Sequence, residues 1–253
     1  TKYLFENYYP QVEFTAELLG VPLEAYVNSP NSYVTKILQG RKLYEQGIIT
    51  EDINRDRHPE IYKEDKGNFQ AAHIELYEPG YHQNNYKIDF ASFYPSVAMA
   101  LNLGPDTTRI VGYEDYIDEV AFDGSFIYIP DNKIGKRVKI QIDTDRKSSL
   151  YEMSKQFKEM RAPYKALKTK EAKSKSNALK IMVNTFYGSN TNPYINYGDM
   201  SVGITITAVS RFLLLSAIHL IREKYGQKSV VYCHTDGINT NVDVDEKWLI
   251  KRL

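Results

Sequence analysis

Hydrophobic positions recur with a helical period in several parts of the chain. Residues 29–47 combine Ser and Asn caps, apolar Val34, Ile37, Leu38 and Leu43, and a stop at Gly47, so the pattern predicts helices within residues 11–48. Four more stretches have helical spacing or caps, and they cover residues 94–104, 177–188, 206–226 and 245–253. Gly188 is expected to end the second of these.

A further helix is expected in the basic stretch that follows residue 145. Phe157, Met160, Tyr164 and Leu167 occupy positions i, i+3, i+7 and i+10 there. Pro163 weakens this prediction, because a proline in a helix interior removes a hydrogen bond and marks a kink or a helix start.

Two stretches have the features of β-strands. Residues 69–93 indicate two short strands around a Pro-Gly turn and a polar loop, and residues 232–239 indicate a hairpin that reverses at Asp236-Gly237. Strands and helices mix without a repeating strand–helix–strand order, so the expected fold class is α+β.

Composition is that of an ordinary globular protein. The chain has 253 residues, of which 42% are hydrophobic and 25% are charged, and it contains one cysteine. A single cysteine excludes an internal disulfide framework and fits a reducing compartment. No apolar run approaches the roughly 20 residues that span a membrane, and no signal peptide is evident. We therefore expect a cytoplasmic protein with no membrane partner.

Charge is unevenly distributed, although the net charge is zero. Residues 146–180 hold 11 Lys and Arg against 3 Glu, a balance of +8, whereas residues 111–131 hold 6 acids and no Lys or Arg. A basic stretch of this kind faces a polyanion or forms a solvated helix surface, and charge alone leaves both interpretations open.

Candidate chemistry lies at two acids and one set of basic side chains. Asp89 ends an apolar strand and Asp236 lies at a hairpin tip; each position also suits an ordinary turn-forming Asp. Arg161 and Lys165 are four residues apart, as are Lys180 and Asn184. Residues at this spacing share a helix face, so two antiparallel helices could direct three cations at one anion.

Three segments together resemble the family B DNA polymerases, which occur in archaea, eukaryotes and many viruses. "DFASFYPS" (89–96) resembles the first palm motif with Phe93 in place of Leu, and "KIMVNTFYG" (180–188) resembles the fingers motif with Thr185 in place of Ser. "YCHTDG" (232–237) is a degraded form of the third motif, Tyr-Gly-Asp-Thr-Asp-Ser. The likeness covers nearly the whole chain.

The resemblance implies the roles of individual residues. Asp89 and Asp236, with the carbonyl of Phe90, would be the catalytic ligands of two Mg²⁺ ions, for which Mn²⁺ can substitute. Nucleotide-binding roles would fall to the backbone N–H groups of Ser92, Phe93 and Tyr94, and to the side chains of Arg161, Lys165, Lys180 and Asn184. The sugar and the nascent base pair would meet Tyr94, Asn184, Tyr187 and Gly188.

His234 and Thr235 are the uncertain positions of this site. The family pattern usually has an acid at position 234, and Mg²⁺ disfavours imidazole whereas Mn²⁺ tolerates it better. On an extended strand, positions 234 and 236 share a face, so His234 is expected to point toward the site. His234 is then either a permissible departure or a sign of a decayed site, and Gly237 in place of Ser adds to that question.

The implied architecture is a polymerase right-hand palm, an antiparallel sheet backed by helices, with a helical-hairpin fingers subdomain. Residues 1–140 and 191–253 would form the two parts of the palm, and residues 141–190 the fingers. Only 17 residues follow Asp236 (253 − 236), so a thumb is expected to be absent, as is a proofreading exonuclease.

The implied function is template-directed DNA synthesis by a DNA-directed DNA polymerase. Its partners would be dNTPs and primer–template DNA, and its activity as this fragment would be weak or absent. The thumb and exonuclease domains of a larger chain would complete the enzyme. It would act in the cytoplasm or, for a virus, in the cytoplasm or nucleoid of its host. A viral or archaeal source is expected. The alternative is a catalytically silent, polymerase-like module that binds DNA or a partner; a nucleotide cyclase is disfavoured by the paired cations.

Overall fold

The computed structural model describes residues 2–30, 32–48, 69–190 and 198–253 and divides into two compact units. The first unit comprises Thr1–Gly67, Ala98–Arg109 and Ile142–Gly203, and the second comprises Asn68–Val97, Ile110–Gln141 and Ile204–Leu253. Helices and sheets are both present, so the expected mixture of α and β structure is confirmed.

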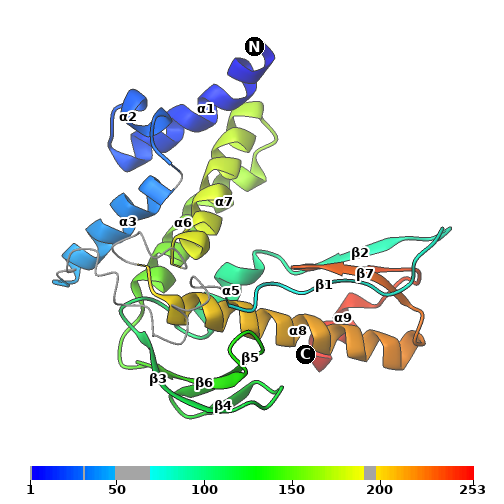
Figure 1. Ribbon diagram of the computed structural model, residues 1–253. Helices are drawn as coiled ribbons and strands as arrows, with labels where there is room; N and C mark the ends of the chain where they lie inside the picture. Colours follow the sequence, from blue (N-terminus) through cyan, green and yellow to red (C-terminus); the bar gives the residue numbers. More distant parts are fainter. Residues whose placement is uncertain (1, 31, 49–68, 191–197) are drawn as a thin grey trace. The chain divides into compact units, whose positions relative to one another are not determined.

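Helices dominate the first unit (Figure 1). It contains α1 (Lys2–Leu19), α2 (Leu23–Val27), α3 (Ser32–Glu45), α6 (Ser149–Ala166) and α7 (Lys170–Asn190). The helices expected within residues 11–48 are therefore present, and α1 extends further toward the N-terminus. The largest fully buried side chains of this unit are Leu19, Leu103, Leu179, Met182 and Phe186.

The helices α6 and α7 form an antiparallel hairpin. The rings of Phe157 and Phe186 lie 5.6 Å apart, and Arg161 Nε donates to Ser176 Oγ at 3.1 Å nearer the connection. Gly188 does not end α7, which continues to Asn190, so this prediction is wrong. A glycine ends a helix when it takes a positive φ, and Gly188 is not among the residues with positive φ.

The second unit contains a four-stranded antiparallel sheet in which strands from distant parts of the chain interleave. Its order is β1-β7-β8-β2, formed by β1 (Ile74–Leu76), β2 (Tyr86–Asp89), β7 (Val230–His234) and β8 (Gly237–Thr240). The two strands predicted within residues 69–93 are present, and they flank the hairpin of β7 and β8 (Figure 1).

A second antiparallel sheet has the order β3-β6-β5-β4, with β3 (Thr108–Asp115), β4 (Ala121–Asp123), β5 (Phe126–Asp131) and β6 (Lys136–Ile142). The sequence analysis assigned no strand here. Ile127 and Ile129 of β5 are buried, as are Val138 and Ile140 of β6, whereas Lys139 lies over the ring of Phe126 at 4.5 Å. This alternation shows which face packs inward.

Three further helices complete the described chain: α5 (Phe93–Ala100), α8 (Met200–Tyr225) and α9 (Glu246–Arg252). By length and composition α8 could cross a membrane, but 67% of its most apolar window is buried, as in the core helix of a soluble protein. Its residues Ile206, Leu214 and Ile221 are among the largest fully buried side chains.

Candidate active site

The two predicted carboxylates lie at one end of the β1-β7-β8-β2 sheet, Asp89 on β2 and Asp236 in the turn that precedes β8. Asp89 is the last residue of β2 and pairs with Gly237, the first residue of β8. Asp236 immediately precedes Gly237, and its carbonyl accepts a hydrogen bond from the N–H of Phe90 at 2.8 Å. Strand pairing thus brings Asp89, Phe90 and Asp236 together from segments that are far apart in the sequence.

The turn between β7 and β8 differs from the predicted one. His234 pairs with Gly237, so the chain reverses at Thr235 and Asp236 rather than at Asp236-Gly237. Thr235 has a φ of 57°, and the N–H of Asp236 donates to the carbonyl of His234 at 2.6 Å. Residues 234–236 are therefore not an extended strand, and the argument that placed His234 and Asp236 on one face by alternation is wrong.

Cross-strand pairing nevertheless places His234 beside the site. Gly237 pairs with His234 on one side and with Asp89 on the other. Directly paired residues of an antiparallel sheet present their side chains on the same face. His234 and Asp89 therefore share a face, with only the hydrogen atoms of Gly237 between them.

A lysine that the sequence analysis missed lies against Asp89. Lys87 Nζ is 2.9 Å from Asp89 Oδ1. The hydrogen bond to Asp89 raises the pKa of Lys87 above its usual value, and the charge of Asp236 adds to the effect. The sequence signal was available, because residues two apart on a strand point to the same face.

The segment after β2 turns into the helix α5. Ser92 has a φ of 51°, and its carbonyl accepts from the N–H of Ser96 at 2.9 Å, so the first turn of α5 starts directly behind the strand end. Phe93 is buried and its ring stacks on Phe90 at 4.4 Å. Burial is the main reason that the pKa of Tyr94 is raised; the charge of Asp236 raises it further and that of Arg211 lowers it.

The predicted cations form a separate group in the hairpin of α6 and α7, within the first unit. Arg161 contacts Ser176, and Lys180 and Asn184 follow Ser176 on α7 at steps of four residues. Lys165 and Ser176 line the same pocket of about 200 Å³ at the end of the hairpin. The side chain of Tyr187 lies outside the described residues.

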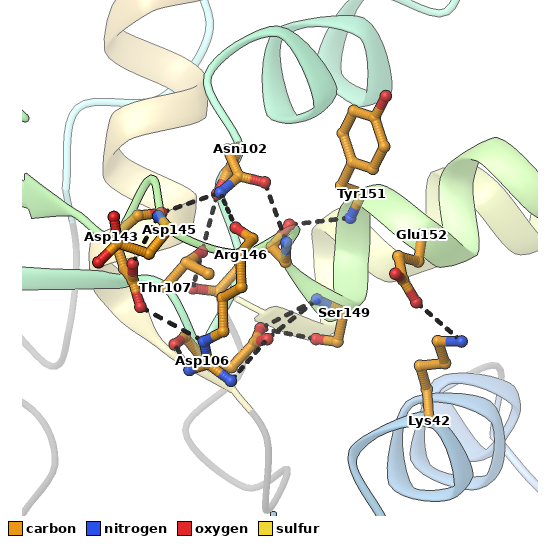
Figure 2. A network of polar contacts seen from close by, with 12 residues as sticks. Lys42, Asn102, Asp106, Thr107, Asp143, Asp145, Arg146, Ser149, Tyr151 and Glu152 are labelled. Carbon is orange, nitrogen blue, oxygen red and sulfur yellow. Dashed lines mark hydrogen bonds and ion pairs between the residues drawn. The ribbon is translucent and has the colours of Figure 1, made fainter. Parts of the chain in front are cut away.

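A polar network holds the start of α6 to the segment that follows α5 (Figure 2). The side-chain amide of Asn102 donates to the carbonyls of Asp143 and Arg146, and its oxygen accepts from the N–H of Ser148 at 2.9 Å. The carboxylate of Asp106 accepts from the N–H and the hydroxyl of Ser149. The sequence analysis did not identify this network.

Comparison with known proteins assigns the chain to a protein family. The family model described as "DNA polymerase family B" matches residues 29–248. The chain belongs to DNA polymerase family B.

DNA polymerases of archaea are among the relatives of this chain. The chain is 25% identical over 249 residues to the DNA polymerase of Thermococcus gorgonarius and 32% identical over 123 residues to that of Archaeoglobus fulgidus; these matches cover 98% and 47% of the chain. The solved family B DNA polymerase of Pyrobaculum calidifontis is similar in fold, with a TM-score of 0.67, 20% identity and 98% coverage of this chain.

The chain is shorter than the polymerases that it matches. It spans 31% of the Thermococcus gorgonarius polymerase, 14% of that from Archaeoglobus fulgidus and 31% of the solved Pyrobaculum calidifontis chain.

The residues at the strand ends fit a hard divalent cation. Two carboxylates and a neighbouring backbone carbonyl supply the oxygen donors that Mg²⁺ prefers. Among the described residues, no group of three or more His, Cys, Asp or Glu is arranged to hold a metal, so any metal here depends on Asp89 and Asp236. Substrate phosphates and water commonly complete such a coordination shell.

Proposed function

We propose that the chain is the palm and fingers portion of a DNA-directed DNA polymerase that transfers nucleotides from dNTPs to a primer 3′-hydroxyl. The observation that carries this proposal is the pairing of β2 with β8, which sets Asp89 beside the turn that contains Asp236. The family relationship supports DNA synthesis, and DNA and dNTPs are the substrates that follow from it.

Each group of residues has a task in this reaction. Asp89 and Asp236 would hold two divalent metal ions, which, when bound, neutralise the triphosphate and activate the primer hydroxyl. The N–H groups at the start of α5 would bind phosphate oxygens, because the N-terminus of a helix carries a partial positive charge. The Tyr94 ring would lie under the sugar and make the site selective for deoxynucleotides.

The hairpin of α6 and α7 would act as the fingers. Arg161, Lys165 and Lys180 would bind the triphosphate, and Asn184, Tyr187 and Gly188 would line the nascent base pair. Arg161 has a planar guanidinium that can bind two phosphate oxygens, and its Nε is oriented by Ser176.

Primer extension with labelled DNA and Mg²⁺ or Mn²⁺ tests the proposal. Asp236→Asn should lower extension by about 10³-fold or more, because it removes a charged ligand whose contribution amounts to several kcal/mol. Glu246→Gln, at the exposed start of α9, is the matched control and should leave extension unchanged.

Primer extension by a His234 variant distinguishes an active polymerase from a catalytically silent module. Restoring the acid with His234→Asp should preserve or raise extension, since it adds a carboxylate on the face that carries Asp89. If no variant of the full-length protein extends a primer with either metal, the chain is instead a polymerase-like module that binds DNA or a partner.

A further inference from the structure

We propose that Lys87 is a built-in cation of the candidate metal site, which competes with the divalent metal for Asp89, and that Gly237 provides the space for it. This inference rests on the proposed function, because it concerns the metal site of that reaction. It assigns a role to two residues that depart from, or lie outside, the motifs of the family.

Lys87 is placed by the strand that carries Asp89. The two residues are separated by one position on β2, so their side chains leave the sheet on the same face. Their charged groups are 2.9 Å apart, within the range of a charge-assisted hydrogen bond. The side chains are 65% and 52% exposed, so the ammonium group can leave the carboxylate without breaking a buried contact.

Gly237 is the neighbour that leaves room for this arrangement. A Cβ at position 237 would be 3.1 Å from Lys87 Cε and 3.7 Å from Asp89 Oδ1. Gly237 is not among the glycines with positive φ, so the backbone does not demand glycine there. Glycine at position 237, where the family motif has Ser, therefore leaves room for Lys87 without a shift of its side chain.

The charges of the site show why Lys87 matters. Asp89 and Asp236 contribute two negative charges and Lys87 one positive charge, which leaves −1 where a divalent cation must bind. His234 adds no carboxylate to compensate. Both side chains are more than half exposed, so the effective dielectric is close to that of water. Repulsion between a bound divalent ion and an ammonium group about 6 Å apart then weakens metal binding by about tenfold. The pair is exposed, so Lys87 competes with the metal but does not exclude it.

Titration of the chain with Mn²⁺ alone tests the competition between Lys87 and the metal. Electron paramagnetic resonance measures the free Mn²⁺ at each step. Lys87→Gln keeps a hydrogen-bond donor but removes the charge, and it should bind Mn²⁺ about tenfold more tightly than the wild type. Lys87→Arg retains the charge and should resemble the wild type. The matched control is Lys136→Gln, which breaks an exposed pair with Asp115 (3.3 Å) on the other sheet and should have no effect.

Two double variants make the test specific. In an Asp89→Asn background, Lys87→Gln should tighten binding less than in the wild type, because the carboxylate for which lysine and metal compete is gone. Gly237→Ser should displace Lys87 and tighten binding to a smaller degree, with no additional gain in the Lys87→Gln background.

Several results would overturn the inference. The first is Mn²⁺ binding by Lys87→Gln that is unchanged or weaker than that of the wild type. The second is that Lys87→Arg tightens Mn²⁺ binding as much as Lys87→Gln does. The third is that neither the wild type nor Lys87→Gln binds Mn²⁺. Primer extension by the wild type, abolished by Asp236→Asn, would still support the proposed function in each of these cases, so the two failures are distinguishable.

Discussion

Cys233 shows how burial controls one side chain next to the candidate site. It is fully buried on β7, one residue before His234, and its thiol lies 3.9 Å from the hydroxyl of Tyr77. Burial is the main reason that the pKa of this thiol is raised. Because thiolate is the reactive form, a raised pKa and a buried sulfur both make Cys233 unreactive in the folded chain.

The reactivity of Cys233 is therefore a measure of folding. It is the only cysteine in the chain, so release of the chromophore from a disulfide reagent reports on it alone. At pH 8 the native chain should react about 100-fold more slowly than the chain in denaturant, because reaction requires local opening. Rates within threefold of each other would contradict the buried position, and Cys233→Ser should not react.

The same group gives a pH dependence with a defined sign. Its folded pKa is above the unfolded value of about 8.5, so the stabilisation is fully present below that pH. It is lost as the pH rises through the folded pKa. The wild type should therefore lose more stability than Cys233→Ser between neutral and alkaline pH.

Capping decides stability at the scale of single helices. Ser148 is fully buried at the start of α6, where its hydroxyl oxygen accepts from the N–H of Tyr151 and its O–H donates to the carbonyl of Leu103, both at 2.9 Å. Ser148→Ala removes a cap and leaves the Leu103 carbonyl without this donor. We expect a loss of about 2 kcal/mol in the free energy of unfolding, measured by urea titration with far-ultraviolet circular dichroism.

Asp245 offers a matched cap for this prediction. Its carboxylate accepts from the N–H groups of Lys247 and Trp248 at the start of α9, but these contacts are exposed. Asp245→Ala should cost about 1 kcal/mol or less. An equal or larger loss for Asp245→Ala than for Ser148→Ala would show that burial of the α6 cap contributes nothing.

Helices were predictable from the sequence because their signals are local. The spacing of Phe157 and Tyr164 indicated α6 despite Pro163, which falls near the helix end, where it disturbs less of the hydrogen-bond ladder. The strands β5 and β6 were missed although buried and half-buried residues alternate along β6. Over residues 111–131, which hold six acids and no Lys or Arg, charge is a stronger signal than the period of apolar positions.

Only those residues of the candidate site that lie within sequence motifs could be predicted from the sequence. The motifs pointed to Asp89 and Asp236, and the structure places Asp89 at the end of β2 and Asp236 in the turn directly before β8. Lys87 and the position of His234 depend on which residue of β2 and of β7 pairs with Gly237, and this register is set by tertiary pairing. The network of Asn102 and Asp106 likewise joins segments more than 40 residues apart.

Across the whole chain, the two compact units share backbone elements. The helices α5 and α8 each contain a unit boundary, after Val97 and after Gly203. Unfolding of one unit should therefore also unfold part of α5 and α8, and so remove helical residues that belong to the other unit. We expect one calorimetric transition in which the calorimetric and van't Hoff enthalpies agree. Two separated transitions would show that the units unfold independently.

The two-residue turn at Thr235 and Asp236 also limits how this gene can change. Substitutions there alter chemistry but keep the spacing between His234 and Gly237. An insertion or deletion of a single codon would shift the pairing by one residue and turn the side chains of β8 to the opposite face. The hydrogen-bond register thus fixes how the third motif faces the first, and viable variants of this hairpin should differ by replacement and not by length.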